Sequence, residues 1–115
     1  MLSRSQRRSS VQYLIVGQHP PDLCPSANET VRKLSAEGAG QIPELAEKLG
    51  VKLLATYVPM NNHMVFAAVE ADDMDSVREF AFQSRLGQWN TLDLYQVSTL
   101  EEALTKVTEL PTIYG

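Results

Sequence analysis

Cysteine is the scarcest reactive residue of this 115-residue chain, because Cys24 is the only one. A single cysteine cannot form a disulfide within the chain, so nothing argues for an oxidising compartment, and we expect a cytoplasmic protein. No apolar run approaches the ~20 residues of a membrane-spanning helix, and we expect no membrane partner. A glycine-rich phosphate loop, a G-x-S-x-G motif and paired carboxylates are also missing. These absences argue against a disulfide scaffold, a membrane span and several motif-defined enzyme classes.

Basic residues are few and unevenly placed. The chain has a net charge of −4 at pH 7, yet its first ten residues hold Arg4, Arg7 and Arg8 and no acid. The acidic remainder argues against a nucleic-acid partner, since phosphate binding requires a basic surface. We interpret residues 1–10 as a flexible basic N-terminal arm. The alternatives are a misplaced start codon, a contact with an acidic partner, or a targeting peptide, although the segment lacks the apolar region of a secretory signal.

Four apolar or alternating stretches predict β-strands within one domain at residues 11–107, followed by a tail at residues 108–115. The strands are expected at residues 11–17, 51–58, 63–71 and 90–97. The sequence Pro-Met-Asn-Asn separates the second strand from the third and predicts a hairpin between them.

Capping patterns predict where the helices begin. Ser26 and Glu29 form a capping box for a first helix that ends near residue 36. Gly38, Gly40 and Pro43 are expected to break or kink this helix, so that a second segment starts at Pro43. Two later helices are predicted at residues 74–86, capped by Asp72 or Asp73, and up to about residue 107, capped by Thr99 with Glu102 or Ser98 with Glu101.

The predicted order of elements is β-α-β-β-α-β with an extra C-terminal helix, which is the ferredoxin-like α+β arrangement. In that topology an antiparallel four-stranded sheet has the order 4-1-3-2, and both helices cover one face. Residues 64–69 place apolar side chains on both faces of their strand, so a monomer would expose one apolar row. We therefore expect a homodimer that pairs two sheet faces, and a higher homo-oligomer if Ile113 and Tyr114 pack on another dimer.

The ending QWNTLDLYQVSTLEEAL, together with this order of elements, resembles the dimeric α/β-barrel superfamily of small stand-alone ferredoxin-like domains. The chain also resembles an uncharacterised bacterial family within it that has a similar Trp-Asn ending and an acidic last helix. The resemblance covers about residues 11–107 and implies the fold and a homodimer. The superfamily includes antibiotic-biosynthesis-type monooxygenases and muconolactone-isomerase-like proteins, but no catalytic motif of theirs matches positions in this sequence.

The predicted topology brings three chemically reactive residues to one edge of the sheet. The end of the first strand and the tip of the hairpin lie at the same edge, because the third strand pairs with the first. His63 at the start of the third strand should therefore lie near His19, which follows the first strand. Cys24, in the proline-rich loop after His19, is expected to fold back over both histidines.

Two imidazoles and a thiolate are a ligand set for zinc, copper or non-haem iron, so we predict a transition-metal site at His19, Cys24 and His63. Asn62 is the candidate for a supporting contact behind these ligands. The spacing H-x4-C is no recognised metal motif, and two alternatives stay open. Cys24 can instead be a reactive thiol, activated by the positive end of the following helix and a nearby histidine. The loop can also be a rigid crossing in which Cys24 packs as a small apolar residue and the histidines cap strand ends.

Three further residues are candidates for a supporting contact or a ligand pocket: Tyr57, Trp89 and Tyr95. Packing is the more common role of such residues, through a Trp anchor or a Tyr hydroxyl at the rim of the sheet. The leading functional hypothesis is a small ligand- or metal-binding protein. The alternatives are a cofactor-poor oxygenase- or isomerase-like enzyme and an oligomeric assembly or regulatory module without chemistry.

Overall fold

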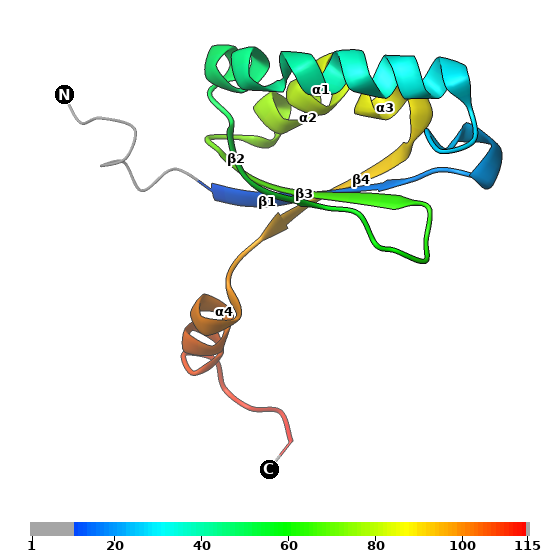
Figure 1. The fold of residues 1–115 in the computed structure, drawn as a ribbon. Coiled ribbons are helices and arrows are strands. Elements are labelled where there is room, and N and C mark those ends of the chain that lie inside the picture. Colours follow the sequence, from blue (N-terminus) through cyan, green and yellow to red (C-terminus); the bar gives the residue numbers. More distant parts are fainter. Residues whose placement is uncertain (1–10, 115) are drawn as a thin grey trace.

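A four-stranded antiparallel sheet with helices on one face makes up the fold in the computed structural model, which describes residues 11–114 (Figure 1). The strands are β1 (Val11–Gln18), β2 (Lys52–Tyr57), β3 (Met64–Ala71) and β4 (Thr91–Val97). The helices are α1 (Glu29–Leu49), α2 (Met74–Gln83), α3 (Leu86–Trp89) and α4 (Leu100–Val107), with a 3₁₀ turn at Pro21–Leu23. The basic arm expected at residues 1–10 lies outside the described residues.

The sheet has the order β2-β3-β1-β4, and every pair of neighbours is antiparallel. Read from the β4 edge, this order is 4-1-3-2. The two hydrogen-bonded partners of β1 are therefore β3 and β4, both distant in sequence. This α+β arrangement is compatible with a ferredoxin-like fold.

The first helix differs from the sequence prediction. Helix α1 is continuous from Glu29 to Leu49 and has Pro43 inside it, so the expected break does not occur. Its N-cap is Asn28, whose side chain accepts a hydrogen bond from the backbone N–H of Val31 (3.0 Å), and the predicted capping box at Ser26 is wrong. Gly50 ends the helix in the left-handed conformation that favours glycine.

The later helix starts follow the predicted caps. Asp73 accepts a hydrogen bond from the backbone N–H of Ser76, and Thr99 accepts one from Glu102. The helix that begins after Asp73 is shorter than predicted, because α2 ends at Gln83. Arg85 then adopts a positive φ of 75°, and this turn starts the single-turn helix α3.

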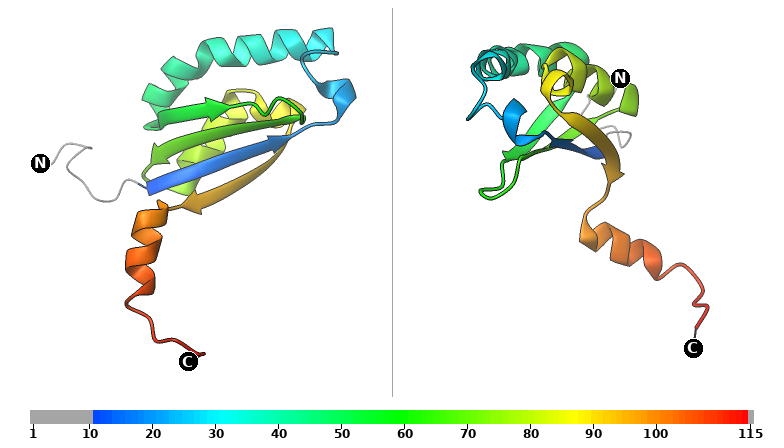
Figure 2. Two further views of the ribbon diagram at one scale, coloured as in Figure 1. Left: turned by 60° about the horizontal axis from the view of Figure 1, so that its bottom comes forward. Right: turned by 90° about the vertical axis from the view of Figure 1, so that its right-hand side faces the viewer.

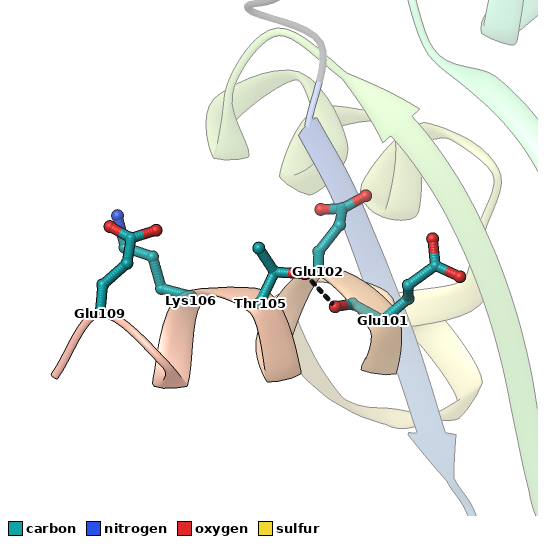
Figure 3. A pocket seen from close by; sticks show the side chains of 5 residues that line it. All are labelled: Glu101, Glu102, Thr105, Lys106 and Glu109. Carbon is teal, nitrogen blue, oxygen red and sulfur yellow. Dashed lines mark hydrogen bonds between the residues drawn. The ribbon is translucent and has the colours of Figure 1, made fainter. Parts of the chain in front are cut away.

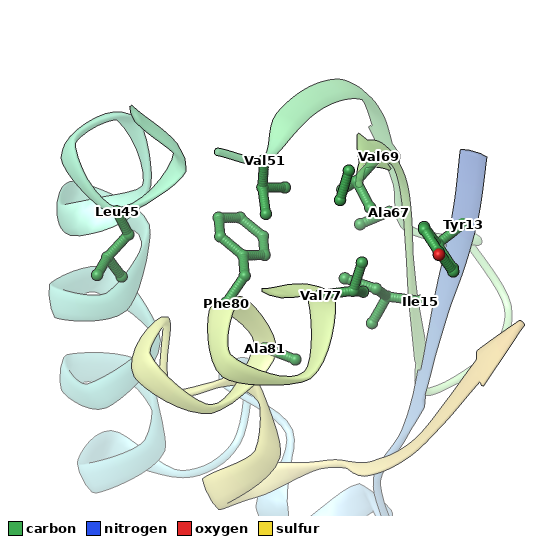
Figure 4. Packing of buried hydrophobic residues seen from close by; sticks show 10 residues of the cluster. Tyr13, Ile15, Leu45, Val51, Ala67, Val69, Val77, Phe80 and Ala81 are labelled. Carbon is green, nitrogen blue, oxygen red and sulfur yellow. The ribbon is translucent and has the colours of Figure 1, made fainter. Parts of the chain in front are cut away.

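The hydrophobic core lies between the sheet and helices α1 and α2 (Figure 4). Its largest fully buried side chains are Phe80 and Val77 from α2, Ile15 from β1 and Val69 from β3. Successive strand residues point to opposite faces, so these strand residues share the face that the helices cover. The core thus fixes the β1–β3 register that also positions the end of each strand.

The opposite face of the sheet is not covered by α1, α2 or α3, and α4 extends away on this side from the end of β4 (Figure 2). We call this surface the open face. By strand register it comprises Gln12, Leu14, Val16 and Gln18 of β1, Lys52, Ala55 and Tyr57 of β2, Met64, Phe66, Ala68 and Glu70 of β3, and Thr91, Asp93, Tyr95 and Val97 of β4. Tyr57 and Tyr95 are 68% and 52% exposed there. Across residues 11–114, no helix is long and apolar enough to cross a membrane.

Candidate metal centre

The edge where β1 ends and β3 begins brings the two histidines together. Gln18 of β1 pairs with Met64 of β3 in the antiparallel register. The residue after Gln18 is His19 and the residue before Met64 is His63, so the two histidines face each other beyond the end of the paired strands. The backbone N–H of His19 donates to the carbonyl of His63 over 3.1 Å and extends the ladder by one bond. The two imidazole rings meet edge to face, with 5.6 Å between their centroids.

The proline-rich loop then returns Cys24 to the same edge. The 3₁₀ turn at Pro21–Leu23 folds the chain back, and the backbone N–H of Cys24 donates to the carbonyl of Pro21 over 3.2 Å. As a result, one ligand atom from each of His19, Cys24 and His63 lies within 4.8 Å of the other two. The predicted convergence of these three residues is confirmed.

Asn90 holds the His19 ring in one tautomer. The Asn90 side-chain N–H donates to the carbonyl of Leu86 (3.1 Å), which turns its oxygen toward His19. That oxygen accepts a hydrogen bond from His19 Nδ1 over 2.8 Å, so Nδ1 carries a proton. Nε2 is buried, and no neighbour in the described part of the chain meets hydrogen-bond geometry with it. A buried ring nitrogen without such a partner is costly for a structural histidine, and in the neutral ring its lone pair is what a metal ligand requires.

Cys24 sits in surroundings that favour its thiolate. The Ser26 hydroxyl donates to Cys24 Sγ over 3.0 Å. Hydrogen bonds from the Ser26 side chain and backbone, and then the nearby His19 side chain, lower the pKa of the Cys24 thiol from 9.0 to about 6. The sequence hypothesis assigned this effect to the start of a helix and to a nearby histidine. The histidine contributes, but α1 begins only at Glu29, and the principal cause is Ser26. Most of the Cys24 side chains are therefore ionised at neutral pH, and the thiolate is the form that binds metals.

Alkylation of Cys24 should follow this lowered pKa. In metal-free folded protein, the rate of reaction with iodoacetamide is expected to rise with a midpoint near pH 6, and in denaturant near pH 9. The pKa of Cys24 is lower in the folded protein than in the unfolded chain. The thiolate therefore contributes to the stability of the fold above pH 9, and this contribution is lost as the pH falls through about 6.

The substitution Ser26→Ala should raise the midpoint of the alkylation rate in the folded protein. The control Ser35→Ala should not, since Ser35 donates to the carbonyl of Arg32 on α1. A folded midpoint near 9 would contradict the assignment.

The remaining predicted site residues divide into two groups. Trp89 is buried beside the cluster, with its ring 5.0 Å from the His19 ring. Asn62 is exposed in the loop next to His63, and no hydrogen bond joins it to the three residues. Tyr57 and Tyr95 lie on the open face, on the side of the sheet away from the helices. The structure thus brings Trp89 to the site and leaves the two tyrosines outside it.

The sequence does not predict two contacts of the candidate site: that of Asn90 with His19 and that of Ser26 with Cys24. The topology does carry a signal for Asn90, because β4 also pairs with β1 and Gln18 lies opposite Thr91. The residue before β4 must then lie beside the residue after β1. The pattern of Ser26 and Glu29 predicts a helix cap, and its spacing does not indicate that the Ser26 hydroxyl donates to Cys24.

The arrangement provides two imidazole nitrogens and one thiolate, with one side open to solvent. His19 is 9% exposed and rigidly held, whereas His63 is exposed. A comparison with known protein families and with curated proteins finds no family model and no protein that matches the chain. The chemistry of the site is therefore argued from its own residues.

Proposed function

We propose that the protein binds a transition-metal ion through His19 Nε2, Cys24 Sγ and a ring nitrogen of His63. The observation that carries this proposal is the buried Nε2 atom of His19, which has no hydrogen-bond partner by geometry among the described residues and lies in a cluster with Cys24 and His63. Metal–ligand bonds of about 2.0–2.3 Å in a tetrahedral site separate ligand atoms by roughly 3.5 Å. The cluster is slightly wider than this, with atoms within 4.8 Å, and the exposed His63 is free to close the difference by rotation.

The donor types select the class of metal. A thiolate with two imidazoles suits zinc, copper or non-haem iron and does not suit magnesium or calcium, which prefer oxygen ligands. Three protein ligands leave a fourth position on the exposed side of the site. A position of that kind accepts water or a small ligand and is typical of catalytic rather than structural zinc sites.

The proposal also includes a homodimer formed through the open face, in a reducing compartment such as the cytoplasm. The exposed Tyr57 and Tyr95 and the half-buried Leu14, Met64 and Phe66 of the open face support the dimer, because a contiguous apolar patch often marks an interface. The single cysteine, with its thiolate as a ligand, is compatible with a reducing compartment.

Metal binding is tested on protein purified without a histidine tag. We expect elemental analysis to find one zinc, copper or iron ion per chain. Titration of the metal-free protein with Co²⁺ should produce a thiolate-to-metal absorption band. Cys24→Ser should abolish this band and weaken binding by more than about 100-fold, since losing a ligand costs more than losing a supporting contact. Ser35→Ala is the control and should bind as the wild type does. Absence of stoichiometric metal, together with no band on titration, would refute the proposal.

A further inference from the structure

Helix α4 has two chemically distinct sides. Its polar side carries Glu101, Glu102, Thr105 and Lys106, with Glu109 just after the helix, and the Thr105 hydroxyl donates to the carbonyl of Glu101 over 3.1 Å (Figure 3). Its apolar side carries Leu100, Leu104 and Val107 at the i, i+4, i+7 spacing of an amphipathic helix. These three side chains are 75%, 58% and 58% exposed, and no residue of α4 is buried.

The polar side of α4 is the one that faces its own chain. Glu102 lines a hollow at the end of the sheet together with Gln12 of β1, Glu70 of β3 and Val97 of β4. The apolar residues Leu100, Leu104 and Val107 occupy the opposite side of the helix and are exposed. Only Ser98 and Thr99 separate β4 from α4, and the Thr99 cap fixes the first turn. A helix with this orientation presents its apolar side to another molecule.

The residues after α4 continue the exposed apolar surface. Leu110, Ile113 and Tyr114 are 62%, 88% and 88% exposed. We call residues 100–114 the C-terminal arm. At roughly 100 Å² of apolar surface for each large side chain, the C-terminal arm and the open face together present on the order of 1,000 Å² per chain. This area is sufficient for a stable interface, which needs about 800 Å² from each partner.

We propose that the C-terminal arm of one chain packs on the open face of a second copy, and that the second copy returns the same contact. The proposal rests on the homodimer proposed above and specifies which surfaces of the two chains are in contact. Both the apolar arm and the apolar face belong to the same chain, so a two-fold axis pairs each arm with a face and leaves neither unmatched. A different protein would cover one of these surfaces and leave the other exposed.

The test combines sedimentation with a contact measurement on full-length protein. Leu104→Glu places a charge on the apolar side of α4 and should weaken the dimer at least about 100-fold, because it is lost from both symmetric contacts. Thr105→Glu introduces the same charge on the polar side and should leave the dissociation constant near that of the wild type. In a mixture of ¹³C-labelled and unlabelled chains, isotope-filtered NMR should show contacts between the Leu104 methyls of one chain and the Tyr95 or Tyr57 ring of the other.

The outcomes separate this inference from the dimer itself. A dimer that survives Leu104→Glu with unchanged affinity, or that lacks filtered contacts from Leu104, would overturn arm exchange while the face-to-face dimer stands. A wild-type chain that is monomeric at micromolar concentration would overturn both. Contacts of Leu104 to aromatic rings of its own chain alone would show that the arm folds back, and would also overturn the exchange.

Discussion

Gly38→Ala is expected to lower the free energy of unfolding by about 2 kcal/mol, although alanine is the better helix former. A Cβ atom at position 38 would lie 2.0 Å from the carbonyl oxygen of Ser84, a distance that no real contact allows. That oxygen cannot retreat easily. The Ser84 backbone is tied to the carbonyl of Phe80, and Arg85 next to it already has a positive φ. Overpacking against backbone costs up to about 3 kcal/mol, and the gain in helix propensity offsets about 1 kcal/mol of this.

Gly40→Ala is the matched control in the same helix. Nothing lies within 4 Å of a Cβ at position 40, so only the helix propensity changes, and stability should rise by about 0.5–1 kcal/mol. Urea unfolding of the three proteins, followed by circular dichroism, measures both effects. If Gly38→Ala and Gly40→Ala shift the midpoint in the same direction, the close approach of α1 to Ser84 is not present in the folded protein.

These two glycines also explain why the sequence predicted a broken helix where the structure has a continuous one. The local sequence around Gly38 predicts a helix break. In the structure, the absence of a Cβ at Gly38 allows α1 to pack close to the turn after α2. Pro43 removes one backbone donor and crowds the preceding turn, yet α1 continues through it, and Leu45 two residues later is buried in the core. Tertiary packing thus determines that α1 is continuous. The local sequence does not show which distant part of the backbone lies beside a glycine.

The candidate site was predictable to the extent that strand pairing determines it. Residues that end β1 and begin β3 must meet in this topology, so the proximity of His19 and His63 followed from the element order alone. The partner of His19 Nδ1 required knowledge of the second pairing, between β1 and β4, which brings Asn90 across 71 positions of sequence. The Ser26 hydrogen bond required the local turn geometry of the loop, which spacing does not reveal.

Removing either histidine should abolish metal binding, but only one of the two substitutions should destabilise the metal-free protein. His19 is buried, and its loss leaves a cavity and deprives the Asn90 oxygen of its donor. His19→Ala should therefore lower the free energy of unfolding by about 1–3 kcal/mol without any metal present. His63 is exposed, and His63→Ala should change the metal-free stability by less than about 0.5 kcal/mol.

Added metal then distinguishes ligation from packing. A metal ion at about 1,000 times its dissociation constant stabilises the wild-type fold by about 4 kcal/mol, and we expect both variants to lose this gain. Urea unfolding of each protein with excess Zn²⁺ and with a chelator separates the two effects. A metal-dependent gain that persists in His63→Ala would remove His63 from the ligand set. Equal metal-free stability of His19→Ala and wild type would show that the Asn90 hydrogen bond is not maintained, and with it the reason for Nε2 to face the site. In the proposed site, the buried His19 would fix the position of the metal, and the exposed His63 would leave one side open for a further ligand.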